Sequence, residues 1–186
     1  SEIEKLIEEL RRELEKVKDE LERSIEEMDR ELDDVRRDSK RDHMVLHEYV
    51  NAAGITTKRG DRPEEVLRKE LEDIKRKLRR ILEEHHEKIR RIKEKLRREN
   101  KRVRDELKRI KDEIDEKVKD VRRKGADEEL LKRLEEVAED VKRALEELLK
   151  KHTRVVERVE KALDELDKEL ERIVREAEKE LDRREK

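Results

Sequence analysis

The sequence predicts an all-α protein, a monomeric bundle of three very long helices that run up, down and up, each antiparallel to the next. Three observations predict it. Apolar residues recur at every third or fourth position along almost the whole chain, which is the spacing of one helix face. The three Gly and one Pro lie near two points that divide the 186 residues into three similar lengths. Charged residues make up 60% of the chain and aromatic residues 1%, a composition typical of coiled coils and long-helix bundles.

The first helix is expected over residues 2–58. Ser1 and Glu4 form a capping box, in which the serine hydroxyl accepts a hydrogen bond from the backbone amide of Glu4. Gly54 and Gly60 are both candidates for the left-handed residue that ends the helix. The residues expected to face the core are Ile3, Leu6, Ile7, Leu10, Leu14, Val17, Leu21, Ser24, Ile25, Met28, Leu32, Val35, Ser39, Asp42, His43, Leu46, Tyr49, Val50 and Ala53.

The second helix is expected over residues 62–123 and the third over residues 127–186. Asp61 is the expected N-cap of the second helix, Pro63 is tolerated in its first turn, and Gly125 ends it. The core-facing residues expected in the second helix are Leu67, Leu71, Ile74, Leu78, Ile81, His85, Ile89, Ile92, Leu96, Asn100, Val103, Leu107, Ile110, Ile114, Val118 and Val121. Those expected in the third are Leu131, Leu134, Val137, Ala138, Val141, Leu145, Leu148, His152, Val155, Val156, Val159, Leu163, Leu166, Leu170, Ile173, Ala177 and Leu181.

The three helices are expected to form a single domain over residues 1–186. Apolar residues make up 31% of the chain, which is close to two positions in every seven. A seam that narrow supplies one shared core and leaves no second apolar face for another subunit. We therefore expect a monomer.

Five of the polar residues at predicted core positions fall at two levels of the bundle. Counting from the two turns, Ser24, Asn100 and His152 are expected at one level of the bundle, and Ser39 and His85 at another. A polar group in a core is costly unless it is hydrogen-bonded, so these residues predict two buried hydrogen-bond layers that fix helix order and register. The alternative is a pH-responsive bundle, in which protonation of His85 or His152 disrupts its layer.

Neither of two histidine pairs completes a metal site. His43 and His47 are one helical turn apart and could supply two ligands, but no further ligand accompanies them. His85 and His86 are adjacent, so they are expected to point in different directions. Carboxylates occur throughout the chain, on solvated faces without a cleft that would shift their pKa values. We therefore expect no metal, no cofactor, no catalytic residue and no enzymatic activity.

The balance of charge excludes two classes of partner. The chain has 55 basic and 57 acidic residues, finely mixed, so no basic patch is expected for nucleic acid or for a membrane surface. No apolar run reaches the length of a membrane span, and no signal peptide is visible. We expect a soluble protein without nucleic-acid or membrane partners.

One segment, Arg41–Thr56, departs from the rest of the chain. Its sequence, RDHMVLHEYVNAAGIT, contains β-branched residues, Asn and Gly, which are poor helix formers. It also reads with the two-residue period of a β-strand. One strand face would carry Met44, Leu46, Glu48, Val50 and Ala52, and the other Val45, His47, Tyr49, Asn51 and Ala53. A strand sequence thus lies within a helical chain, with its largest apolar groups in register with the helical seam.

This strand-like segment resembles the eleventh β-strand of green fluorescent protein, in the more polar form used as a split-reporter tag. The resemblance covers 16 of the 186 residues. The family's natural strand is more apolar at the positions of His47, Tyr49 and Asn51, all on the outward face of the barrel. The resemblance implies that the remaining ten strands are the partner and that Glu48 faces the chromophore after complementation. The residues implied to bind that partner are Arg41, Asp42, His43, Met44, Val45, Leu46, His47, Glu48, Tyr49, Val50, Asn51, Ala52, Ala53, Gly54, Ile55 and Thr56.

The helical remainder resembles a de novo designed three-helix bundle of the cage-and-latch type, in its uniform composition, clean caps and minimal turns. That style implies a synthetic protein with no native location, produced in a cytoplasm. The expected function is a switch that cages the strand-like segment as helix and releases it when the bundle opens, so that complementation gives fluorescence. A displacing helix or key peptide is left open as a further partner. The alternatives are a scaffold that carries the segment as a passive tag and a natural coiled-coil spacer.

Overall fold

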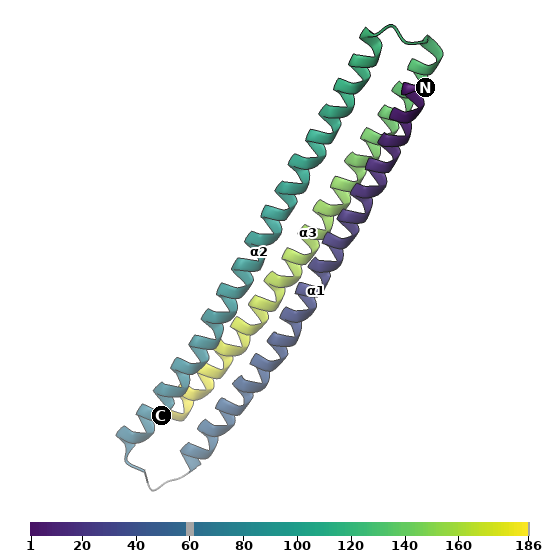
Figure 1. The fold of residues 1–186 in the computed structure, drawn as a ribbon. Coiled ribbons are helices and arrows are strands. Elements are labelled where there is room, and N and C mark those ends of the chain that lie inside the picture. Colours follow the sequence, from purple (N-terminus) through teal and green to yellow (C-terminus); the bar gives the residue numbers. More distant parts are fainter. Residues whose placement is uncertain (59–61, 186) are drawn as a thin grey trace. The chain divides into compact units, whose positions relative to one another are not determined.

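The computed structural model describes residues 1–58 and 62–185, and within those residues it contains only α-helices and short connections (Figure 1). Helix α1 spans Glu2–Lys58, α2 spans Glu64–Arg123 and α3 spans Glu128–Glu185. The expected all-α three-helix bundle is confirmed. The first helix has its expected bounds, whereas the second and third begin two residues and one residue later than expected. The expected N-cap, Asp61, lies outside the described residues.

Local hydrogen bonds define two of the helix ends. The backbone N–H of Glu4 donates to Ser1 Oγ at 3.3 Å, which is the first half of the predicted capping box. After α2, Gly125 has a φ of 71°, in the left-handed region that glycine adopts without steric cost. Its N–H donates to the backbone oxygen of Arg122 at 3.2 Å. This tight turn returns the chain antiparallel to α2.

Gly54 does not end the first helix, because α1 continues through it for one more turn to Lys58. Thr57 Oγ1 donates to the backbone oxygens of Ala53 and Gly54, at 3.1 and 3.0 Å, and Ala53 is fully buried. These contacts offset the low helix propensity of glycine, about 1 kcal/mol relative to alanine. The other candidate for the helix end, Gly60, lies outside the described residues.

The chain forms two compact units, and each of the three helices contributes a segment to both. Unit 1 comprises Ser1–Asp29 and Lys95–Arg158, and unit 2 comprises the described residues of Arg30–Glu94 and Val159–Lys186. In unit 1, α2 runs antiparallel to α1 and α3 (Figure 1). The apolar core of unit 1 consists of Ile3, Ile7, Leu10, Val17, Leu21, Val103, Leu107, Ile110, Ile114, Val121, Leu134, Ala138, Val141 and Leu145.

Unit 2 contains the strand-like segment and has its own core. The helices have the same relative directions as in unit 1. Half-buried apolar residues, among them Tyr49 and Val50, pack around the fully buried ones. The buried residues are Leu46, Ala53, Leu71, Ile74, Leu78, Leu170, Val174, Ala177 and Leu181.

The expected core position Ile173 is wrong in detail. Val174 is buried, whereas Ile173 packs at the edge of the core. The reason is helix geometry, because Val174 lies four residues after the buried Leu170 and three before the buried Ala177. Whether Ile173 or Val174 is buried depends on the rotation of α3 about its own axis.

We predict that amide hydrogens of residues 45–57 exchange faster than those of residues 5–25 in the same helix. The later stretch is rich in residues of low helix propensity, so its local opening requires less free energy. Hydrogen–deuterium exchange resolved by mass spectrometry measures the difference, with residues 5–25 as the internal control. Equal or greater protection of residues 45–57 would contradict this prediction.

Candidate functional site

The strand-like segment, Arg41–Thr56, is helical throughout as part of α1. The helix turns Leu46 and Ala53 into the core, with 1% and 0% of their surface exposed, and it half-buries Tyr49 and Val50. In a strand, Leu46 and Val50 would lie on one face, and Tyr49 and Ala53 on the other. The helical form therefore engages apolar groups from both faces of the strand at once.

The opposite side of the segment faces solvent. Met44 and Ile55 are 65% and 61% exposed, although both are large apolar residues. Glu48, which the resemblance associates with a chromophore, is also on the exposed side of the helix. The other exposed residues are Arg41, His47, Asn51 and Ala52, and the other half-buried ones are Asp42, His43, Val45 and Gly54. The side chain of Thr56 lies outside the description.

Helices α2 and α3 form the wall against which the segment packs. Its fully buried residues are Leu71, Ile74, Leu78, Leu170, Val174, Ala177 and Leu181. At the edge of this wall, Lys77 Nζ lies 5.5 Å from the ring centroid of Tyr49, a cation–π contact worth about 0.5 to 1 kcal/mol. Tertiary contacts, rather than intrinsic propensity, therefore hold this stretch of α1 in helical form.

Arg184, in the last turns of α3, lies across the end of the segment. Its Nη1 donates to the backbone oxygen of Val50 at 3.4 Å. A β-carbon at Gly54 would lie 2.9 Å from the same nitrogen, so the guanidinium occupies space that glycine leaves open. Arg184 also pairs with Glu180 at 3.4 Å.

The first polar layer joins all three helices of unit 1, and we call it the Ser24 layer, although Ser24 itself is half-buried rather than buried as expected. His152 of α3 is 0% exposed. Its Nε2 lies 3.0 Å from Ser24 Oγ of α1, and its Nδ1 lies 3.0 Å from Asn100 Nδ2 of α2. The same Nδ2 donates to Thr153 Oγ1 at 3.1 Å, and Asn100 Oδ1 accepts from Arg104 Nη2 at 3.3 Å. These two contacts fix the orientation of the amide.

The donors in the Ser24 layer determine the tautomer of His152. The amide nitrogen of Asn100 can only donate, so His152 accepts at Nδ1 and carries its proton on Nε2. That proton goes to Ser24 Oγ, whose own hydroxyl donates to Glu99 Oε1 at 3.4 Å. A hydrogen bond from Arg102 is the main cause that lowers the pKa of Glu99. Burial lowers the pKa of His152, so the layer favours neutral histidine.

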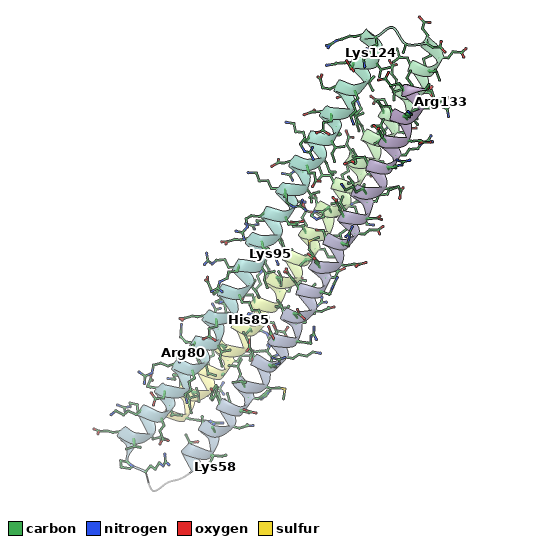
Figure 2. All side chains as sticks on the ribbon, viewed as in Figure 1. Lys58, Arg80, His85, Lys95, Lys124 and Arg133 are labelled. Atoms are coloured by element: carbon green, nitrogen blue, oxygen red, sulfur yellow. The ribbon has the colours of Figure 1, made fainter. Side chains whose placement is uncertain are left out.

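The second buried polar layer lies in unit 2, and we call it the Ser39 layer. His85 Nε2 of α2 lies 2.8 Å from Ser39 Oγ of α1, and both residues are buried; Figure 2 labels His85. His85 Nδ1 lies 3.1 Å from Asp167 Oδ1 of α3. His86 Nδ1 lies 2.6 Å from each oxygen of the same carboxylate. The layer thus joins all three helices through a carboxylate that the sequence reasoning missed.

His85 and His86 leave the helix in different directions, as adjacent helical residues do, yet both rings reach Asp167. His85 faces the core and His86 lies half-buried at its rim, so one carboxylate on the facing helix bonds both. The sequence feature that could have identified Asp167 is its place in the third helix, one helical turn after the predicted core residue Leu163. Such carboxylates are frequent in this chain, which is why the pattern alone did not single it out.

A small cavity borders the Ser39 layer between α1 and α2. Its volume is about 220 Å³, and it is lined by Val35, Asp38, Arg41, Asp42, Ile81, Glu84, His85, Lys88 and Ile89. Burial is the main cause that raises the pKa of Asp42, and Glu84 raises it further, whereas His85 and His43 lower it. Charged groups from both helices thus surround the space beside the layer.

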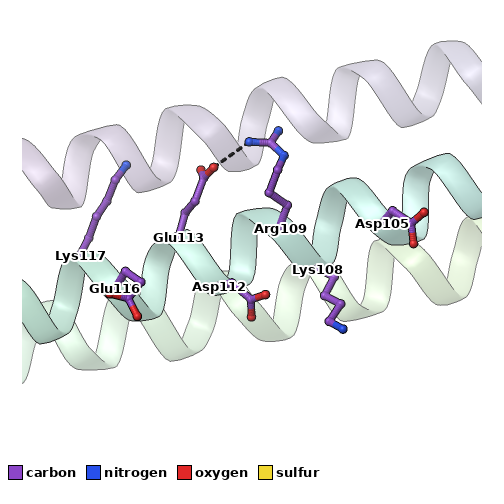
Figure 3. Close-up of a pocket in the computed structure, with 7 residues that line it drawn as sticks. All are labelled: Asp105, Lys108, Arg109, Asp112, Glu113, Glu116 and Lys117. Carbon is purple, nitrogen blue, oxygen red and sulfur yellow. Dashed lines mark hydrogen bonds and ion pairs between the residues drawn. The ribbon is translucent and has the colours of Figure 1, made fainter.

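A groove on the surface of unit 1 is of a different kind (Figure 3). All the residues that line it are charged and come from α2: Asp105, Lys108, Arg109, Asp112, Glu113, Glu116 and Lys117. Arg109 Nη1 pairs with Glu113 Oε1 at 2.7 Å, one helical turn away. A mixed row of this kind is typical of a solvated helix face.

The polar groups of the described residues are well paired. Within residues 1–58 and 62–185, every buried side-chain nitrogen and oxygen has a hydrogen-bond partner. In the same part of the chain, no group of three or more His, Asp or Glu side chains is arranged to hold a metal ion. None of the helices, as far as they are described, contains a stretch apolar enough to cross a membrane.

We predict that His152 makes the folded protein less stable in mild acid. Burial lowers its pKa in the folded state, so below the unfolded pKa of about 6.5 the unfolded chain binds more protons. The free energy of unfolding therefore falls as the pH falls from about 6.5 to the lowered pKa, by at most about 1.4 kcal/mol per pH unit. Urea unfolding between about pH 7.5 and about pH 5 measures this slope, and His152→Gln should lack this contribution.

His47→Gln is the matched control, because the ring of His47 faces solvent. This variant should keep the pH dependence of the wild type. Parallel stability curves for the wild type and His152→Gln would contradict the role assigned to the buried ring.

We also predict that Gly54→Ala stabilises the protein by up to about 1 kcal/mol, because Gly54 is inside α1 and alanine has the higher helix propensity. The new β-carbon would press on Arg184 Nη1, which is the far end of a flexible side chain and can move. Urea unfolding measures the gain. Gly125→Ala is the contrasting control, because its φ of 71° makes a side chain costly there, and it should destabilise. A loss of stability in Gly54→Ala would mean that the Arg184 contact outweighs propensity.

Comparison with known proteins gives no relative: no protein-family model, no curated protein and no solved structure matches this chain.

Proposed function

We propose that this protein cages a β-strand sequence, residues 41–56, in helical form. In this proposal the strand-like segment is withheld as helix from the ten-strand fragment of green fluorescent protein, and opening of unit 2 releases it for complementation. The observation that carries the proposal is that Arg41–Thr56 lies wholly within α1, with Leu46 and Ala53 buried against α2 and α3. Apolar groups of both strand faces are engaged in that packing, so neither face is free to take its place in a barrel.

Geometry supports the requirement that opening comes first. Sixteen residues span about 24 Å as a helix but about 53 Å as a strand, so the segment cannot extend in place. In the helix its backbone N–H and C=O groups are also used within α1, whereas strand pairing needs them for the neighbouring strands. Complementation in the caged state is therefore excluded by both length and hydrogen bonding.

The opposing energies make opening accessible. Burial of Leu46 contributes about 1.5 to 3 kcal/mol to the helical state. The β-branched residues, Asn and Gly around it each disfavour helix by about 0.5 to 1 kcal/mol. Summed over these residues, the propensity cost at least matches the contribution of Leu46 alone, which favours local opening of unit 2. Binding of the ten-strand fragment to the open form would then draw the equilibrium toward it by mass action.

A displacing helix or key peptide would act on the same equilibrium, by covering the wall of α2 and α3 in place of the segment. A pH-responsive bundle is the second candidate function, and the lowered pKa of the buried His152 favours it. In that case acid would supply the trigger, because protonation in the unfolded chain opposes burial of the ring. Neither proposal involves catalysis or a cofactor.

We predict that Leu78→Ala speeds complementation. Leu78 is fully buried in the wall beside the segment, and its truncation costs about 2 to 5 kcal/mol. The open population of unit 2 should then rise about tenfold or more, and the initial rate of fluorescence with excess ten-strand fragment should rise in proportion. Leu107→Ala is the matched control, because Leu107 is equally buried in the core of unit 1 and does not contact the segment.

The free peptide of residues 41–56, at equal concentration, defines the uncaged rate. Caging predicts that the intact wild type is much slower than the peptide and that mild denaturant restores its rate. Equal rates for the intact chain and the peptide would contradict caging and would favour the passive-tag alternative. Equal acceleration by Leu78→Ala and Leu107→Ala would mean that release requires global rather than local unfolding.

A further inference from the structure

The two polar layers differ in the group that faces Nδ1 of the histidine. In the Ser24 layer that group is the amide nitrogen of Asn100, which can only donate a hydrogen bond. In the Ser39 layer it is the carboxylate of Asp167, which can only accept one. A histidine that takes up a second proton donates from both ring nitrogens. The two layers therefore differ in whether that proton finds an acceptor.

The Ser24 layer has no acceptor for a second proton on His152. That proton would lie on Nδ1 and point at Asn100 Nδ2, 3.0 Å away, so that two donors would face each other. Rotation of the amide would break its bond from Arg104 Nη2 at 3.3 Å and its bond to Thr153 Oγ1 at 3.1 Å. The ring is 0% exposed, so a donor left unpaired there carries the full cost of burial.

The charges around His152 do not offset that cost. On α2, the negative Glu99 and the positive Arg102 act on the ring in opposite directions. Arg104 adds a second positive charge at the amide of the layer. On α1, the half-buried Glu20 interacts with Arg102. These charges largely cancel, and burial is the main cause that lowers the pKa of His152.

The Ser39 layer can take a second proton on His85 without losing a hydrogen bond. Neutral His85 holds its proton on Nδ1, where Asp167 accepts it at 3.1 Å, and Nε2 accepts from the hydroxyl of Ser39 at 2.8 Å. After protonation, Nε2 would donate to Ser39 Oγ, because a hydroxyl oxygen also accepts. The hydroxyl hydrogen can then turn to the backbone of its own helix, as that of serine often does. The contact with Asp167 becomes an ion pair.

Negative charge predominates around His85. Asp167 contributes a carboxylate from α3. Three further carboxylates and two cations, from α1 and α2, line the cavity beside the ring: Asp38, Asp42, Glu84, Arg41 and Lys88. Burial raises the pKa of Asp42, and a positive charge on His85 opposes that rise, as does one on His43. The surroundings therefore favour a positive ring.

His86 is the other titratable group at this carboxylate. Its Nδ1 lies 2.6 Å from Asp167 Oδ1, at the rim of the layer. The side chain of His86 is 39% exposed, so water largely screens its charge from the buried ring of His85.

We infer that the two units respond differently to acid: mild acid weakens unit 1 through the Ser24 layer, whereas the Ser39 layer of unit 2 accommodates the added proton. Asn100 and Asp167 set this difference. The inference rests on the pH-responsive candidate function, which it assigns to unit 1, and not on caging. The strand-like segment belongs to unit 2, so acid is not the trigger that releases it.

Ring nitrogen-15 chemical shifts of the intact chain, followed from about pH 7.5 to about pH 5, test the inference directly. At the higher pH, they should place the proton of His152 on Nε2 and that of His85 on Nδ1. At the lower pH, His85 should carry two ring protons while unit 2 keeps its helical backbone shifts. His152 should gain a second proton only together with loss of helical shifts in unit 1. The exposed His47 is the internal reference.

Two outcomes of that titration would overturn the inference. One is a doubly protonated His152 in a unit 1 that stays helical. The other is a His85 that stays singly protonated at about pH 5, or that gains its second proton only as unit 2 loses its helical shifts.

Two variants test the roles of the Nδ1 partners by urea unfolding at about pH 7.5 and about pH 5. In the wild type, the unfolding equilibrium constant should rise by up to about tenfold per pH unit below about pH 6.5. Asn100→Asp gives His152 an acceptor and should largely abolish this rise. Asp167→Asn removes the charge that pairs with a protonated His85 and should make the rise steeper.

Asp164→Asn is the matched control for the loss of a carboxylate from α3, because Asp164 pairs with Lys93. It should keep the pH dependence of the wild type. Circular dichroism at about pH 7.5 verifies that each variant is helical. Equal pH dependence of the wild type and Asn100→Asp would overturn the role of the Nδ1 partner alone. A wild type whose stability does not change with pH would overturn the pH-responsive candidate as well.

Discussion

The packing of one face of residues 41–56 against α2 and α3 is the interaction on which the state of unit 2 depends. The stretch has the composition of a strand, yet Leu46 and Ala53 repeat at the spacing of a helix face and are almost completely buried. Tertiary burial thus overrides local propensity, which is the usual order of strength when the two conflict. We expect this conflict to lower the free energy of local opening, which is what the proposed caging requires.

Within this apolar core, the two polar layers specify which helices pack together and in which register. In each layer all three helices meet at one buried histidine, so a slip of any helix would leave a ring nitrogen unpaired. The identity of the residue at Nδ1 then decides the chemistry of the ring. Asn100 places the proton of His152 toward Ser24, whereas Asp167 places the lone pair of His85 toward Ser39. The two layers are hydrogen-bond networks that differ in whether the ring nitrogen of the histidine faces the serine as a donor or as an acceptor.

Much of the fold could be predicted from the sequence, because periodic apolar residues, a capping box and glycine breaks are local signals. The bounds of α1 and the levels of Ser24, Asn100 and His152 followed from these signals and the rise of a helix. The rotation of α3 about its own axis could not be predicted from these signals, since Val174 rather than Ile173 enters the core. Asp167 was also missed, because a carboxylate at the rim of a core resembles every other surface carboxylate until the facing helix is placed. Gly54 stays helical because Thr57 bonds back to the backbone of Ala53 and Gly54 and because the neighbouring Ala53 is buried, and that burial depends on the facing helices.

The central claim is that packing holds a strand sequence in helical form, and backbone carbon chemical shifts of the intact protein test it most directly. The measurement requires the isotopically labelled chain alone, at neutral pH and without the ten-strand fragment. The account predicts helical secondary shifts that continue from residues 30–40 through residues 41–53. Random-coil or extended shifts over residues 41–53, with helical shifts elsewhere in α1, would contradict it.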